Sequence, residues 1–119
     1  TCALPISVDV LHWHNDVVSL PEGAQPLARS AKTKVQAFRF GSALGMQFHL
    51  EVTPTLLEEW LDESSMVKDL KAAGGSKSQL REAFAEYNPQ LQPLADQVFS
   101  SFAARCNSYG QNLAQSQQG

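Results

Sequence analysis

Hydrophobic residues in the first half of the chain follow the period of β-strands. Residues 6–12 and 35–40 place alternate apolar side chains on one face, and residues 43–51 can pair with residues 35–40 across Gly41. A glycine suits this turn because it adopts positive φ without a steric cost. Another short strand is predicted over residues 17–20. The first half is therefore expected to consist of strands and loops.

The apolar period then changes to that of helices. Thr53 is a candidate N-cap for a helix that begins at Pro54, because its hydroxyl can accept from the free amides of the first turn. The apolar stripe of this helix consists of Leu56, Leu57, Trp60 and Leu61. We expect a helix to follow the last strand directly.

Two more helices are predicted in the second half. Residues 74–75, both glycine, break the chain before them. The first covers residues 76–88 and ends at Pro89, and the second, which is the longest, covers residues 89–110. Residues 110–119 are rich in Gln and Ser and carry no core pattern, so we expect a disordered tail there.

The composition is that of an ordinary soluble domain. The 119 residues are 43% hydrophobic with a formal net charge of −3. The nine Lys and Arg residues are scattered, so no basic stripe indicates nucleic acid or an anionic membrane as a partner. No apolar run is long enough to span a bilayer, and no signal peptide is visible. Cys2 and Cys106 suit neither a disulfide framework nor a zinc motif, which predicts a reduced, cytoplasmic setting.

The order of elements predicts a mixed protein, α/β or α+β, because strands dominate the first half and helices the second. The predicted helices need a wider sheet than these strands form. The chain also begins with Thr1 and not with methionine. We therefore expect it to be part of a larger domain.

Candidate chemistry gathers in two patches, His12 with His14 and His49 with Glu51. Side chains at i and i+2 of a strand point the same way, so His49 and Glu51 can share one space. A carboxylate that accepts from one imidazole nitrogen fixes the tautomer, and the other nitrogen is then ready to take a proton. Two alternatives stay open: a histidine that only holds a loop, and a metal site built from these four side chains.

A base and its orienting carboxylate need a nucleophile, and these residues do not provide one in a suitable frame. Cys2 and Cys106 are not flanked by glycines between a strand and a helix, where backbone amides could stabilise an oxyanion. No serine lies in a Gly-x-Ser-x-Gly frame. If the pair is catalytic, its nucleophile is expected upstream of Thr1.

An ordered set of motifs between residues 8 and 61 resembles the C-terminal half of a class I, triad-type glutamine amidotransferase domain, in particular its stand-alone, GMP-synthase-like members. The motifs are "HWHND" at residues 12–16, "LPEG" at 20–23, "QAFR" at 36–39 and "QFHLE" at 47–51, followed by "TP".

The resemblance implies a three-layer α/β/α sandwich of flavodoxin-like type, of which this chain holds only the C-terminal half. Residues 1–53 would supply strands and active-site loops, and residues 54–109 would supply helices. The implied reaction is hydrolysis of the side-chain amide of L-glutamine through a cysteine thioester. His49 would act as base and acid, and Glu51 would orient it. The ammonia passes to an acceptor, often on a partner domain or subunit, and no cofactor is implied.

The resemblance also assigns a substrate loop. His14, Asn15 and Asp16 match the family segment whose backbone holds the α-amino and α-carboxylate groups of glutamine. Asn15 stands where the family has glycine, so we expect it to adopt a left-handed conformation. Leu50 stands where the family has proline, which leaves the spacing from His49 to Glu51 intact.

The largest departure from the family is the missing Gly-x-Cys-x-Gly elbow, so the chain alone is expected to be inactive. Two related functions stay open on these residues. One is a γ-glutamyl peptide hydrolase with the same triad, and the other is a non-catalytic, amidotransferase-like binding or regulatory domain.

Overall fold

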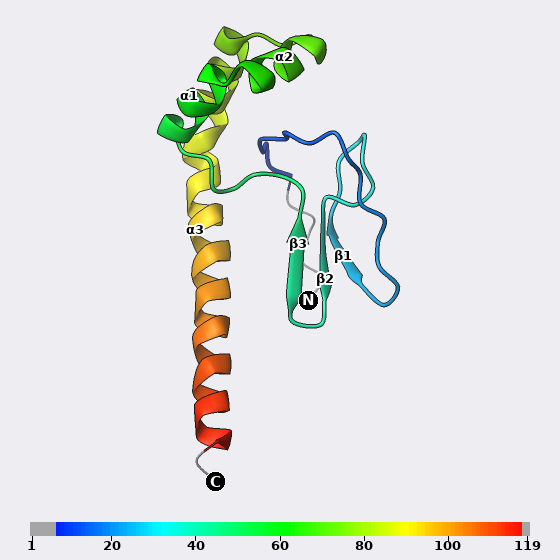
Figure 1. The fold of residues 1–119 in the computed structure, drawn as a ribbon, viewed down its shortest axis with the longest axis vertical. Coiled ribbons are helices and arrows are strands. Elements are labelled where there is room, and N and C mark those ends of the chain that lie inside the picture. Colours follow the sequence, from blue (N-terminus) through cyan, green and yellow to red (C-terminus); the bar gives the residue numbers. More distant parts are fainter. Residues whose placement is uncertain (1–6, 118–119) are drawn as a thin grey trace.

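A computed structural model describes residues 7–117, and Figure 1 shows a small sheet beside one long helix. Within that range the elements are β1 (Gln25–Ala28), β2 (Ala37–Phe40), β3 (Ala43–Met46), α1 (Pro54–Asp62), α2 (Ser64–Ala72) and α3 (Lys77–Ser116). The three strands form one antiparallel sheet in the order β1-β2-β3. The mixed α/β class expected from the element order is confirmed.

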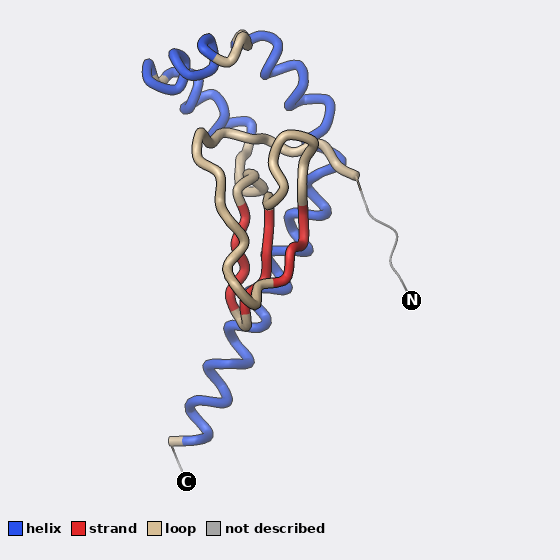
Figure 2. The backbone as a smooth tube through the Cα atoms, turned by 90° about the vertical axis from the view of Figure 1, so that its right-hand side faces the viewer, coloured by secondary structure: helices blue, strands red, loops and turns tan. Residues whose placement is uncertain are grey.

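The predicted hairpin is confirmed, with shorter strands than expected. The β2 and β3 ladder runs from the pair Ala37 and Met46 to the pair Phe40 and Ala43. Gly41 begins the turn with a φ of 58°, a left-handed conformation that a residue with a side chain rarely adopts. In Figure 2 the strands of this sheet lie in front of α3.

Other strand predictions were wrong. Residues 17–20 form no strand, and residues 7–12 contribute only a bridge between Leu11 and His49. Residue 6 lies outside the described residues. The structure has instead a strand that we did not predict, β1, in a segment that contains Pro26. Proline is tolerated there because β1 is an edge strand, and the register shifts between Pro26 and Ala28.

The first helix begins as predicted. The Thr53 side chain accepts from the Leu56 amide at 3.1 Å, and Pro54 occupies the first turn. Glu63 then ends α1 and precedes α2, a helix that the sequence pattern did not separate. Gly74 has a φ of 81° and stops α2, which confirms the predicted break, and Ser76 caps α3 through the Gln79 amide at 3.3 Å.

The two predicted C-terminal helices are one helix of 40 residues, so the prediction that Pro89 ends a helix was wrong. Pro89 and Pro93 lie four residues apart and are both exposed, whereas Leu91 and Ala95 are buried. The carbonyls that lose an amide partner belong to Ala85 and Pro89, which are both exposed residues, so water can satisfy them. The helix also continues through residues 110–116, where we expected a disordered tail.

Two apolar clusters hold the helices against the rest of the chain. The first joins Leu11 and Val52 to α1 and α3, and the second joins Leu50 to α3. The buried members of the first cluster are Leu11, Val52, Leu57, Leu61 and Phe84. The buried members of the second are Leu50, Leu91 and Ala95. Arg81 also donates two hydrogen bonds to Glu58, at 2.7 and 2.6 Å, which links α3 to α1 at the surface.

None of the helices found within residues 7–117 combines the length and the apolar character needed to cross a membrane.

Replacing Leu61 by alanine should destabilise the fold. The Leu61 side chain has no exposed area, and its truncation leaves a cavity in the first cluster. We expect a loss of about 3 kcal/mol in the free energy of unfolding, measured by urea denaturation. The exposed Glu59→Ala in the same helix is the control, with a change within about 0.5 kcal/mol. Equal midpoints for the two variants would contradict the burial of Leu61.

Candidate functional site

Alternating burial after β3 places the two candidate catalytic side chains on the same side of the chain. Leu50 and Val52 are only 5% and 3% exposed, because each enters one of the two apolar clusters. The side chains of His49 and Glu51, one position earlier in each case, are 26% and 51% exposed. Burial of the even-numbered residues therefore directs His49 and Glu51 outward together, although regular pairing stops at Met46.

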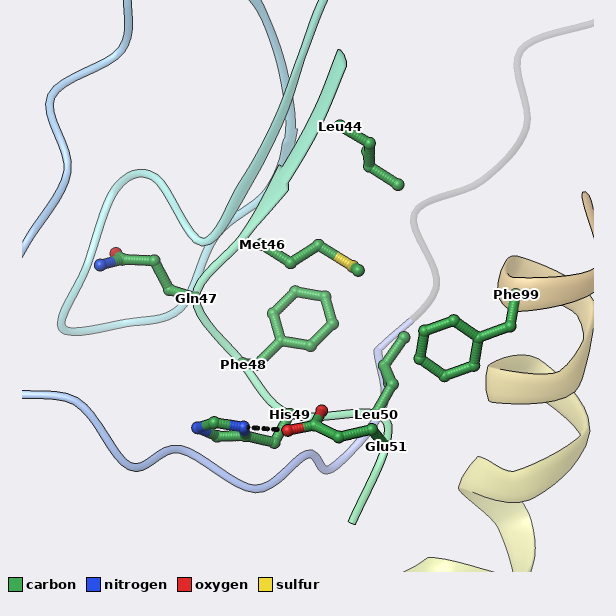
Figure 3. A pocket seen from close by; sticks show the side chains of 8 residues that line it. All are labelled: Leu44, Met46, Gln47, Phe48, His49, Leu50, Glu51 and Phe99. Atoms are coloured by element: carbon green, nitrogen blue, oxygen red, sulfur yellow. Dashed lines mark hydrogen bonds and ion pairs between the residues drawn. The ribbon is translucent and has the colours of Figure 1, made fainter. Parts of the chain in front are cut away.

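The predicted contact between His49 and Glu51 is present. Their Nδ1 and Oε1 atoms lie 2.7 Å apart (Figure 3). Because an ionised carboxylate can only accept, Nδ1 carries the hydrogen and donates it to Glu51. In the neutral ring the lone pair is then on Nε2, the atom suited to take a proton from a substrate or a nucleophile.

The hydrogen bond also affects the charge of Glu51. Burial raises the pKa of this carboxyl, but the hydrogen bond from His49, the charge of His49 and hydrogen bonds from the backbone together outweigh burial, and the pKa lies below the ordinary value of 4.5. Glu51 is therefore ionised at neutral pH, which is the state that a carboxylate needs to orient an imidazole.

An aromatic contact with Trp60 also restrains the His49 ring. Trp60 of α1 meets His49 edge to face, with ring centroids 5.1 Å apart, and Trp13 meets Trp60 in the same way at 5.7 Å. These contacts restrict rotation of the imidazole about its side-chain bonds. The backbone of His49 is also fixed, because its amide donates to the Leu11 carbonyl at 2.9 Å.

The predicted substrate loop bends at Asn15. His14 donates from Nδ1 to the Asp16 carbonyl at 2.8 Å, and Asn15 and Asp16 are exposed. The expectation for Asn15 was wrong, because no described residue other than glycine has a positive φ. The hydrogen bond within the turn is made without a left-handed residue at its centre.

Gln47 connects this loop to the His49 region, and the sequence predictions missed it. Its Nε2 donates to the Asp16 carbonyl at 3.1 Å across 31 residues. Within residues 7–117, no hydrogen bond joins the loop directly to His49 or Glu51. The signal in the sequence was position, since Gln47 precedes His49 by two residues and polar side chains continue at every second place to Glu51.

His12 lies beside His14 and Phe48. Its ring lies 5.9 Å from that of His14 and 6.5 Å from that of Phe48, measured between centroids. Burial lowers the pKa of His12 below its ordinary value of 6.5, and the charges of His14 and His49 lower it further. His12 is therefore neutral at pH 7.

The four possible metal ligands do not converge on one point. Across the part of the chain that the structure describes, no three His, Cys, Asp or Glu side chains are placed to hold one ion. The geometry therefore does not support the metal alternative.

A groove of about 450 Å³ opens beside the pair of His49 and Glu51. Figure 3 shows His49 and Glu51 at one end of it, with Leu44, Met46 and Phe48 directed toward Phe99 of α3. Cys106, which is exposed on α3, does not line the groove, and Cys2 lies outside the described residues.

Neither a comparison with protein-family models nor a search of curated proteins finds a match for this chain.

The pKa of Glu51 should rise when its partner is removed. In His49→Ala the carboxyl loses both the hydrogen bond and the charge that lower its pKa. The titration midpoint of the Glu51 side-chain carbon, followed by NMR, should therefore move upward. In the unchanged protein the bond stabilises the fold above pH 4.5 and the contribution is lost as the pH falls through the lowered pKa. His14→Ala, which leaves the pair intact, is the control, and an unmoved midpoint in His49→Ala would contradict the assigned contact.

Proposed function

We propose that this chain supplies the base and the orienting carboxylate of a class I glutamine amidotransferase. The observation that carries the proposal is the 2.7 Å hydrogen bond from His49 to Glu51, which leaves Nε2 of the ring as the basic atom. The motif resemblance supports the same assignment, because the family places its general base and orienting carboxylate at these two positions. The proposed domain is a three-layer α/β/α sandwich that contains the described sheet and helices.

In the proposed reaction, Nε2 of His49 takes the proton of a cysteine thiol supplied from outside the described residues. The thiolate attacks the side-chain amide carbon of L-glutamine, and the protonated His49 gives its proton to the departing ammonia. Water then hydrolyses the γ-glutamyl thioester to glutamate and regenerates the thiol. Glu51 remains ionised throughout and stabilises the imidazolium that forms in each half of the cycle.

The loop of His14, Asn15 and Asp16 is proposed to bind the α-amino and α-carboxylate groups of glutamine. Asn15 and Asp16 are exposed, and the Asp16 carboxylate has the charge that an ammonium group requires. The ammonia is proposed to reach an acceptor on a partner domain or subunit, in the cytoplasm.

Removing the base should abolish turnover in the full-length product of the gene. We expect His49→Ala to lower the rate of glutamate release from glutamine by at least about 10²-fold, because proton transfer is lost, and Glu51→Ala to lower it less. Asp69→Ala, at an exposed position on α2, is the control and should keep full activity. Unchanged turnover in His49→Ala would reject the assignment.

The 119-residue chain alone should release no glutamate from glutamine. Its only described cysteine, Cys106, is exposed on α3 and does not line the groove beside His49 and Glu51. A coupled assay for glutamate checks this, with the full-length product as the positive control. Measurable turnover by the chain alone would show that the nucleophile does not come from outside it.

A further inference from the structure

Gln47 links the loop of residues 14–16 to the segment that carries His49 and Glu51. Its Nε2 donates to the Asp16 carbonyl at 3.1 Å, and His14 donates to the same oxygen at 2.8 Å. A carbonyl oxygen has two lone pairs, so these two donors occupy the acceptor sites of Asp16. The Asp16 carbonyl thus accepts one hydrogen bond from within the loop, from His14, and one from outside the loop, from Gln47.

The backbone of Gln47 is hydrogen-bonded directly next to the sheet. Its amide donates to the Gln36 carbonyl at 2.8 Å, one step beyond the last pair of the ladder between β2 and β3. Two residues later, the amide of His49 donates to the Leu11 carbonyl at 2.9 Å. Gln47 is therefore fixed on the same short segment as the base, and a bond from its side chain sets the loop relative to His49.

The orientation of the Gln47 amide follows from its partner. The Asp16 carbonyl can only accept, so the NH₂ group must face it and Oε1 must point elsewhere. Oε1 is buried and has no hydrogen-bond partner among the described residues. A buried oxygen without a partner costs free energy, so an apolar side chain of similar length would serve the packing better. The donor function of Nε2 is the property that glutamine supplies at this position.

We propose that Gln47 is a positioning residue that holds the loop of His14, Asn15 and Asp16 at a fixed place relative to His49 and Glu51. The inference rests on the proposed function, because it concerns how glutamine is held in front of the base. With both acceptor sites of the Asp16 carbonyl occupied, the groups left for the substrate are the Asp16 carboxylate, the Asn15 side chain and the loop amides. Gln47 thereby affects the binding of glutamine more than the chemical step.

Gln36 provides a matched control. It is a glutamine that directly precedes β2, it is 4% exposed, and its Nε2 donates to the Ser30 hydroxyl at 3.1 Å. Its Oε1 is also buried without a described partner. Gln36→Met and Gln47→Met therefore remove the same groups from two residues that flank the ladder of β2 and β3, but only Gln47→Met removes a hydrogen bond to Asp16.

The first measurement uses the 119-residue chain and needs no activity. The heteronuclear NOE of the Asn15 and Asp16 amides reports loop order on the picosecond to nanosecond timescale. We expect these values to fall in Gln47→Met and to stay unchanged in Gln36→Met, while thermal denaturation monitors stability in both variants. An ordered loop in Gln47→Met would overturn the proposal. If Gln47→Met fails to fold, Gln47→Glu, which keeps the length and removes the donor, takes its place.

The second measurement uses the full-length product and glutamine as the substrate. Loss of one neutral hydrogen bond that positions the loop should raise KM about three- to tenfold in Gln47→Met, with kcat within about twofold. Gln36→Met should leave KM unchanged. An unchanged KM in Gln47→Met, in a protein that turns over glutamine, would overturn the inference alone. Absence of turnover in the unsubstituted protein would reject the proposed function, and the loop measurement would still decide whether Gln47 positions the loop.

Discussion

The backbone bridge between Leu11 and His49 is the interaction on which the rest of the molecule depends. It brings the N-terminal loop against the segment that follows β3 and places Leu11 in the first apolar cluster. The same bridge holds the main chain of His49, because the His49 amide donates to the Leu11 carbonyl. Among the described residues, the other hydrogen bond from this N-terminal segment to the region after β3 is the one that the Gln47 side chain donates to the Asp16 carbonyl. One isolated bridge thus supports both the core and the candidate site.

The candidate site follows from burial and not from regular secondary structure. Leu50 and Val52 enter different clusters, one against α3 and one against α1, and so they fix the direction of the whole segment. His49 and Glu51 are presented outward as a result, and Trp60 restrains the imidazole from α1. The hydrogen bond then keeps Glu51 ionised and His49 in one tautomer. Packing decides the geometry, and electrostatics adjusts the protonation states.

Local signals in the sequence predicted the hairpin, the cap at Thr53 and the pairing of His49 with Glu51, because each depends on neighbours in the chain. The failures depend on the environment. Pro89 does not end its helix because it faces solvent, and β1 tolerates Pro26 because it is an edge strand. The bond from Gln47 to the loop spans 31 residues, so the alternation of polar residues from Gln47 to Glu51 marks Gln47 but does not identify Asp16 as its partner. The family's catalytic assignment remains a proposal that the experiments above address.

The length of α3 exceeds what its packing supports. Its side chains are buried or partly buried at intervals up to Val98, and every residue from 99 to 117 is exposed. This stretch has Gly110 in its interior and Arg105 as its single charged residue, so ion pairs along it cannot compensate for missing tertiary contacts. Most of the stability of a helix in a protein comes from the packing of one face, and this stretch is exposed throughout. The amide hydrogens of the last turns should exchange through local opening, while those near Leu91 and Ala95 exchange only when the clusters open. α3 is therefore one helix in its geometry, but its packed part and its exposed part open with different free energies.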